Sequence, residues 1–294
     1  MEQVRREHIR DFHLDHIFDC GQAFRWERQA DGSYTGIAGG KIANIQFLPD
    51  RDCQEEGQIV LSNVTEDDFQ RFWSQYLDLE RDYRAIKEEL AVGDDVMGEA
   101  IGWGQGIRLL RQDPWETLLS FIISQNNHIP RIKACIESLC ENFGKKAGSF
   151  QGQDYYSFPE PETLAALEPE DLDLCKLGYR AKYLVGTARQ VVEDGPERLR
   201  AMALPEVSGE EAFDYVTRFC GVGPKVANCV LLFSMGKYDR FPVDVWMKKV
   251  MKDLYGLETL KEIDQFARRA FGRQGGFAQQ YLFYYIREKE RKQR

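Results

Sequence analysis

A lysine and an aspartate, each expected at the start of a helix, are the residues of this sequence best suited to chemistry. Lys225 follows Pro224, and proline suits the first position of a helix because its missing N–H costs nothing there. Asp244 stands directly before 245–250 and is expected to cap a second helix. An unprotonated lysine amine is a nucleophile, and a fixed carboxylate stabilises positive charge. The two side chains could therefore converge on one reacting group.

The turn before Lys225 contains Gly221 and Gly223, which permit positive φ angles and leave backbone N–H groups open to an anion. Each feature alone is more often structural: a solvated lysine, a simple cap or a plain turn. Their order along the chain nevertheless favours a helix-hairpin-helix unit at about 205–250, with a nucleophile beside an anion site.

Length and composition place the chain among folded proteins of two or three modules, with 294 residues, 43% of them hydrophobic and 30% charged. No apolar run approaches the ~18 residues of a membrane span, and no signal-peptide core follows the charged N-terminus. We therefore expect no membrane partner and a protein that stays in the compartment where it is made.

The cysteines and the net charge narrow the class of partner and cofactor. The seven cysteines are scattered, which argues against a disulfide framework and against zinc or iron–sulfur ligation. A formal net charge of -9 speaks against DNA binding, because neutralisation of phosphates dominates non-specific affinity. Net charge does not show where the individual charges lie, however, and basic residues gather in several short clusters. DNA therefore stays open as a partner.

The first part of the chain has the pattern of an antiparallel sheet with attached helices, expected to form a domain at 1–107. A tight Gly39-Gly40 turn joins the first two strands, and 49–57 is expected to be a polar loop. The expected elements are strands at 34–38, 41–48 and 58–62 and helices at 65–75 and 81–90.

The rest of the chain, 108–294, is expected to form a mainly α-helical domain, so the predicted fold class is α+β. A polar break at 124–131 separates two apolar helices and is as often a simple link as a binding loop. Residues 145–163 are expected to form a loop. The last helix, at 275–286, places Gln279 and Phe283 on one face, although such an aromatic helix is more often core than pocket.

Several separated motifs resemble those of one enzyme family. The run Cys220-Gly-Val-Gly-Pro-Lys-Val-Ala-Asn-Cys229, followed by Pro-Val-Asp244-Val, is similar to the helix-hairpin-helix and Gly-Pro-Asp signature of base-excision DNA glycosylases. Gly21-Gln-Ala-Phe-Arg-Trp resembles the N-terminal motif of the 8-oxoguanine branch. No four-cysteine group follows Asp244, unlike in the branches that resemble endonuclease III and the adenine glycosylase and carry an iron–sulfur cluster.

The resemblance implies roles for the site residues. Lys225 would attack the sugar and form a Schiff base, and Asp244 would stabilise the developing positive charge. A base pocket would be formed by four residues: Gly21, whose carbonyl accepts the N7–H of 8-oxoguanine; Gln279, which meets the Watson–Crick edge; Phe283, which stacks; and Cys229, which forms the opposite wall.

DNA contacts are also implied by the resemblance. Asn126 would fill the gap left by the flipped base, with Tyr179 as a wedge. Asn126, Arg131 and Arg180 would contact the orphaned cytosine. The remaining implied DNA contacts are at Gly221, Gly223 and Trp246. Trp246 stands where the better-known animal members carry a histidine that contacts a phosphate. The hairpin could also hold a structural monovalent or divalent cation, as related hairpins do.

The expected function is a glycosylase and lyase that flips out 8-oxoguanine opposite cytosine in double-stranded DNA, excises it and cleaves the strand by β-elimination. We expect a monomer without a cofactor, in the cytoplasm with the nucleoid in a bacterium and in the nucleus in a eukaryote. Two alternatives remain at this point. One is a glycosylase for other damaged bases, and the other is a non-catalytic helix-hairpin-helix protein, which would need neither Lys225 nor Asp244.

Overall fold

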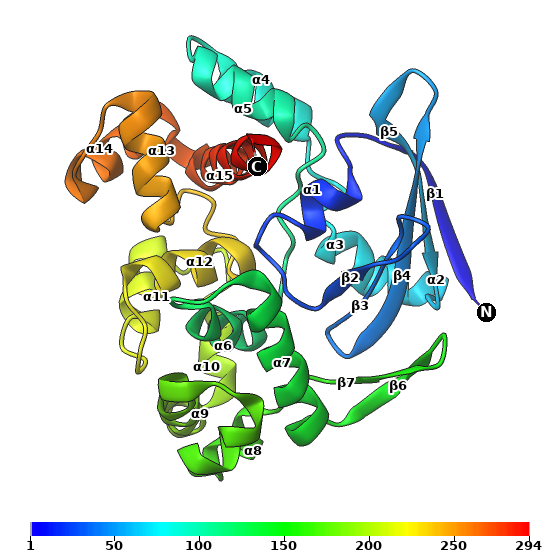
Figure 1. Cartoon of the computed structure of the whole chain (residues 1–294), viewed down its shortest axis with the longest axis vertical. Helices are drawn as coiled ribbons and strands as arrows, with labels where there is room; N and C mark the ends of the chain where they lie inside the picture. Colours follow the sequence, from blue (N-terminus) through cyan, green and yellow to red (C-terminus); the bar gives the residue numbers. More distant parts are fainter. Residues whose placement is uncertain (1, 294) are drawn as a thin grey trace.

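The structure, a computed structural model, describes residues 2–293 and places a five-stranded antiparallel sheet beside a mainly helical part (Figure 1). This arrangement confirms the predicted α+β class. The C-terminal helix α15 lies near the middle of the molecule, between the helices of the helical part and the short helix α1 of the sheet part (Figure 1). A division of the chain at residue 107 stays a prediction.

The sheet has the strand order β1-β5-β4-β3-β2, with every neighbouring pair antiparallel. Its strands are β1 (Gln3–Ile9), β2 (Trp26–Arg28), β3 (Tyr34–Ala38), β4 (Lys41–Asp50) and β5 (Cys53–Ser62). One face packs on a core that includes Ile45, Leu61 and Trp73. The predicted strands are confirmed, but β1 was missed because only Val4 of this edge strand is buried.

The expectation of a loop at 49–57 is wrong. Strands β4 and β5 continue through most of it as paired strands, from Leu48 opposite Gln58 to Asp50 opposite Cys53. This end of the hairpin is largely exposed, so its residues need no apolar alternation to pair, and the sequence pattern gave no strand signal there.

The helices of the first part are α1 (Leu14–Phe18), α2 (Glu66–Asp68), a π-helical turn (Phe69–Trp73), α3 (Ser74–Tyr76), α4 (Tyr83–Ala91) and α5 (Asp95–Trp103). The helices predicted at 65–75 and 81–90 are confirmed. Helix α5 was missed, since Gly98 and Gly102 lower its helix propensity. It forms because it packs against α15, which buries Met97 and Ala100 in the core of the helical part.

The helical part contains α6 (Pro114–Ser124), α7 (Ile129–Phe143), α8 (Pro161–Ala165), α9 (Ala181–Asp194), α10 (Pro196–Ala201), α11 (Gly209–Val216), α12 (Pro224–Ser234), α13 (Val245–Tyr255), α14 (Leu260–Ala270) and α15 (Gly275–Gln293), with 3-10 turns at Pro169–Cys175, Gly178–Arg180 and Gly272–Gln274. Asp113 caps α6 by accepting the Glu116 N–H at 2.9 Å, as expected for Asp-Pro at a helix start. Among residues 2–293, none of the helices combines the length and apolar character needed to cross a bilayer.

The expectation of a loop throughout 145–163 is also wrong. Strands β6 (Lys146–Phe150) and β7 (Gln153–Tyr156) form a hairpin that reaches from α7 to the sheet (Figure 1). Phe150 and Tyr155 bury their side chains against Ile42 of β4. Because these apolar residues pack on a segment far away in the sequence, the local pattern does not reveal them.

Helix α1 is held by two histidines at its start. The rings of His13 and His16 stack at 4.2 Å, and His16 also meets the Tyr284 ring of α15 edge-on at 5.0 Å. The Nδ1 atom of His16 accepts the Gly106 N–H at 3.2 Å. Burial, with a smaller contribution from His13, lowers the pKa of His16 to about 3. In the folded protein the His16 ring is therefore neutral above about pH 3.

We predict that His16→Gln makes the protein less sensitive to acid. Below the usual histidine pKa of about 6.5 the unfolded chain takes up a proton at His16 that the folded chain refuses until about pH 3. Stability is therefore lost as pH falls through this window, by about 1 to 2 kcal/mol between pH 6.5 and 5. Urea unfolding at both pH values measures it, and an equal loss in the wild type and the variant would contradict the assignment.

Candidate active site

The turn between α11 and α12 uses its two glycines differently. Gly221 has φ +77°, and a Cβ there would lie 2.6 Å from the Tyr183 ring, so the fold itself requires glycine. Gly223 has φ -100° and is exposed, and a Cβ there would meet no atom within 4 Å. The fold therefore does not require glycine at 223. Because no atom lies close to this position, the N-terminus of α12 is open to an approaching group.

Lys225 lies in the first turn of α12 and is half-buried. Its Nζ atom is 5.1 Å from the centroid of the Phe121 ring, which stacks on Phe233 at 5.5 Å. Phe121, contributed by α6, was not singled out from the sequence because its pattern there is only that of a core residue. The Lys225 amine thus lies beside a pair of stacked aromatic rings.

Cys229 links the lysine to the aspartate. Its thiol is buried one turn after Lys225, and burial raises its pKa, with Lys225 acting against the shift and Asp244 adding to it. Both charged groups therefore lie near one thiol. Asp244 caps α13, as predicted, by accepting the Met247 N–H at 2.8 Å, which fixes its carboxylate at a helix N-terminus.

Gly21 and Phe283 meet across the boundary between the two parts of the molecule. Gly21 has φ +79°, and a Cβ there would lie 3.4 Å from Cε1 of Phe283. One turn earlier on α15, Gln279 is buried, and its Oε1 atom has no hydrogen-bond partner among the described residues. Buried amide oxygens are almost always paired, so this one is suited to accept a hydrogen bond from a ligand.

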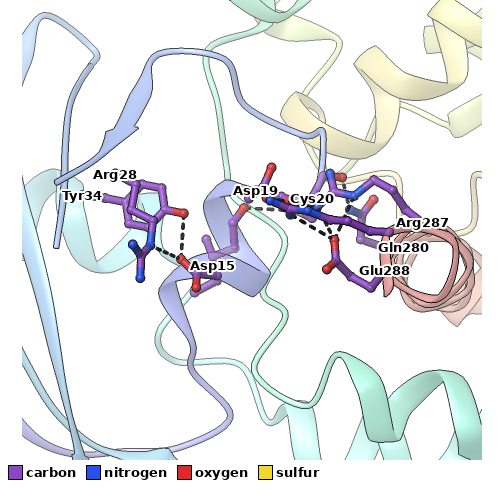
Figure 2. Close-up of polar contacts among 10 residues, drawn as sticks. Asp15, Asp19, Cys20, Arg28, Tyr34, Gln280, Arg287 and Glu288 are labelled. Atoms are coloured by element: carbon purple, nitrogen blue, oxygen red, sulfur yellow. Dashed lines mark hydrogen bonds and ion pairs between the residues drawn. The ribbon is translucent and has the colours of Figure 1, made fainter. Parts of the chain in front are cut away.

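Two glutamines that the sequence did not single out hold the segment around Gly21. Gln22 is buried, donates to the carbonyls of Ile17 and Arg108 at 2.8 Å each and accepts the Leu110 N–H at 2.9 Å. The Nε2 atom of Gln280 donates to the Cys20 carbonyl at 2.8 Å (Figure 2). Gln22 lies within the motif that suggested the site, whereas Gln280 gives no signal apart from its place beside Gln279.

The polar break between α6 and α7 contacts the hairpin. Asn126 is exposed with φ +48°, a conformation that asparagine tolerates. Gln125 donates from Nε2 to the Gly221 carbonyl at 2.9 Å. Arg180 is buried, and its guanidinium donates to the carbonyls of Gln125, Asn126 and Leu177. In this structure Arg180 therefore supports the loop that carries Asn126, while its contact with cytosine stays a prediction.

Three of the expected DNA-contacting side chains are exposed. Tyr179 stands at the start of a 3-10 turn, with half of its surface free. Arg131 donates from Nη2 to the Lys176 carbonyl at 3.3 Å and is otherwise open. Trp246 lies in the first turn of α13 with 42% of its surface exposed. All three can reach an external ligand without a change in the core.

Two cavities lie away from these residues. One of about 1180 Å³ lies between the end of α12 and the β3–β4 turn, and another of about 510 Å³ lies between α7 and the sheet. Neither is lined by Lys225, Asp244, Gln279 or Phe283. The contacts among these residues, rather than empty volume, define the candidate site.

The structure offers no evident metal centre within residues 2–293, where no group of three or more His, Cys, Asp or Glu side chains could hold an ion. A structural cation at the hairpin would have to bind through backbone carbonyls. Those of Cys220 and Gly221 already accept hydrogen bonds from Thr187 and Gln125. Its presence stays a prediction.

The fold and site together define a helix-hairpin-helix protein with a lysine and an aspartate at two helix starts. Residues 119–272 match the HhH-GPD superfamily of base excision DNA repair proteins, and residues 6–118 match the N-terminal domain of 8-oxoguanine DNA glycosylase. The chain therefore belongs to the 8-oxoguanine DNA glycosylases of the HhH-GPD superfamily.

Solved structures and curated relatives agree with this assignment. The chain is 46% identical to MBOgg1 bound to a low-affinity DNA ligand, with a TM-score of 0.91 and coverage of 98% of this chain and 96% of the other. It is 43% identical to the 8-oxoguanine glycosylase/lyase of Clostridium acetobutylicum in complex with DNA containing cytosine opposite 8-oxoG, with a TM-score of 0.89 and 99% of both chains covered. The N-glycosylase/DNA lyase of Saccharomyces cerevisiae is 31% identical over 84% of this chain and 69% of its own.

We predict that alanine at one hairpin glycine lowers the stability of the protein and that alanine at the other lowers its affinity for DNA. Gly221→Ala should destabilise the protein by about 1 to 3 kcal/mol, since it combines a strained φ with the Tyr183 clash. Gly223→Ala should change the unfolding free energy by no more than about 0.5 kcal/mol but weaken DNA binding, because its methyl group intrudes where a phosphate would approach. Denaturant unfolding and duplex titration measure both, and unchanged DNA affinity of Gly223→Ala would refute an anion site there.

Proposed function

We infer that the protein is an N-glycosylase/DNA lyase of base-excision repair that removes 8-oxoguanine from double-stranded DNA. The observation that carries this inference is the combination of Lys225 and Asp244 at two helix starts with Gly21 packed against Phe283 and the buried Gln279 Oε1 atom left free for a ligand by the described residues. The 8-oxoguanine glycosylase/lyase of Clostridium acetobutylicum matches nearly the whole chain at 43 to 44% identity in two solved structures. All of these residues lie in one chain, so we propose that a monomer suffices. We propose that it acts in the nucleoid of a bacterial cell or the nucleus of a eukaryotic one.

Base recognition begins with extrusion of the nucleotide from the duplex, which costs a few kcal/mol. Stacking on Phe283 contributes about 1 to 3 kcal/mol toward that cost. The unpartnered Oε1 of Gln279 suits the N–H donors on the Watson–Crick edge of a guanine-type base. The Gly21 carbonyl accepts the N7–H that 8-oxoguanine has and guanine lacks, a contact whose loss costs about 1 to 3 kcal/mol.

Chemistry then takes place at the sugar C1′. The unprotonated amine of Lys225 attacks C1′ while the bond from C1′ to the base nitrogen breaks, and the base leaves with that electron pair. Asp244 stabilises the positive charge that develops on the sugar. Ring opening gives a Schiff base between Nζ and C1′, and loss of the C2′ proton with the 3′ phosphate then cleaves the strand by β-elimination.

We predict that borohydride traps the wild-type protein covalently on an 8-oxoguanine:cytosine duplex, because borohydride reduces a Schiff base to a stable amine. Lys225→Ala should abolish trapping, since it removes the amine that forms the Schiff base with C1′. Lys261→Ala, at an exposed lysine of α14, is the matched control and should trap like the wild type. Denaturing gels read out the adduct. Trapping that survives Lys225→Ala would show that another amine is the nucleophile.

The DNA-facing residues complete the proposal. Tyr179 acts as the wedge, and Asn126 fills the space that the flipped base leaves. Backbone N–H groups from Gly221 to Gly223 approach a phosphate, with Trp246 nearby on the next helix. Arg131 and Arg180 read the cytosine. For Arg180, the hydrogen bonds to Gln125 and Asn126 support an arrangement in which the plug loop and the guanidinium approach the orphaned base together.

We predict that Arg131→Met relaxes the preference for cytosine opposite the lesion, by about 5- to 100-fold in the ratio of excision rates opposite cytosine and adenine. Methionine keeps most of the unbranched stem of the side chain but removes its donors. Arg71→Met, at an exposed arginine of the sheet part, is the control. Single-turnover excision on the two duplexes gives the ratio. A cytosine preference as strong as that of the wild type would remove Arg131 from this role.

A further inference from the structure

The end of α1 is fastened to α15 by two donors from α15. The Nη2 atom of Arg287 donates to the Asp19 carbonyl and lies 3.4 Å from the Asp19 carboxylate. Gln280 donates to the Cys20 carbonyl at 2.8 Å, and this hydrogen bond is buried. Figure 2 shows both side chains reaching from α15 to the same short segment. We call these four residues, Asp19, Cys20, Gln280 and Arg287, the latch.

The other end of α1 is tied to the sheet. The Oδ1 atom of Asp15 accepts hydrogen bonds from the Tyr34 hydroxyl at 2.8 Å and from Nε of Arg28 at 3.0 Å (Figure 2). Helix α1 thus spans from strands β2 and β3 to α15. The position of the sheet part relative to α15 depends on contacts at both ends of this short helix.

The latch lies next to the base pocket. Gly21 directly follows Cys20, and Phe283 lies three residues after Gln280 and four before Arg287, so the three side chains of α15 share a face. A Cβ at Gly21 would be 3.4 Å from Phe283. Movement of the Asp19–Cys20 backbone away from α15 would therefore widen the gap between the Gly21 carbonyl and the Phe283 ring.

We propose that Arg287 is a positioning residue for base recognition: its contact with the Asp19 carbonyl sets the place of the Gly21 carbonyl above Phe283. This proposal rests on the proposed function, since it concerns how the damaged base is read. Arg287 touches neither Lys225 nor Asp244 in any described contact, so its effect is confined to steps that need the base.

Arg291 offers an internal comparison. It pairs with the same Asp19 carboxylate at 3.2 Å, but it makes no contact with the backbone carbonyl, and 68% of its side chain is exposed. The Arg287 side chain is only 20% exposed and also lies over the Tyr284 ring at 5.6 Å. A charged donor on a shielded carbonyl holds the backbone firmly, whereas an exposed ion pair contributes little.

The test compares two substrates that differ only in whether a base must be read. We expect Arg287→Met to lower single-turnover excision of 8-oxoguanine by roughly 10- to 100-fold, the loss that a displacement of about 1 Å causes. Nicking of a preformed abasic site needs Lys225 but no base pocket, so it should stay within about two-fold. Arg291→Met should leave both rates within about two-fold. Hydrogen exchange of residues 19–23 should become faster in Arg287→Met alone.

The rates on the two substrates distinguish a role of Arg287 in base reading from a general structural role. Equal losses on both substrates would show a merely structural role and overturn the proposal, as would unchanged excision with unchanged hydrogen exchange. Arg287→Lys, which keeps one charged donor, should recover part of the excision rate. If the wild type itself nicks abasic sites but releases no 8-oxoguanine, the proposed function fails, and exchange in residues 19–23 then decides whether Arg287 holds the segment.

Discussion

The structure depends on the burial of the C-terminal helix α15 between the two parts of the chain. Its residues Phe277, Tyr281 and Leu282 are almost fully buried, and it packs against both α5 and α13. Such burial contributes about 1.5 to 3 kcal/mol for each large apolar side chain. Because α15 cannot shift without losing this core, it offers a fixed surface on which Gln279 and Phe283 are presented.

The candidate site combines this fixed surface with groups from two other origins. Gly21 comes from the sheet part, and its backbone is held by Gln22 and by the donors of α15. Lys225 and Asp244 come from two helix starts of the helical part. In the proposed function, a base held by the first set lies beside the Lys225 amine of the second only when both parts keep their relative positions. Buried hydrogen bonds between Gln22 and both Arg108 and Leu110, and between Gln280 and Cys20, hold the two parts together there.

Local signals in the sequence predicted most of the helices and strands, including the two helix starts that carry Lys225 and Asp244. Asp113-Pro114 and Asp244 mark helix starts through contacts within one turn, and both helices begin as expected. Strand β1, helix α5 and the β6–β7 hairpin escaped prediction because their stability comes from segments far away in the sequence. The support that Arg180 gives to the Gln125 carbonyl was missed for the same reason. The assigned DNA contacts stay predictions.

The central claim is that the pocket between Gly21 and α15 reads an oxidised purine. The most direct measurement is single-turnover base release from a set of duplexes that carry 8-oxoguanine, 3-methyladenine or an oxidised pyrimidine, each opposite its normal partner. We expect 8-oxoguanine opposite cytosine to be released at least about 100-fold faster than the other two, since only this base satisfies the Gly21 carbonyl and the Gln279 oxygen together. Faster release of the alkylated base or of the pyrimidine would contradict it.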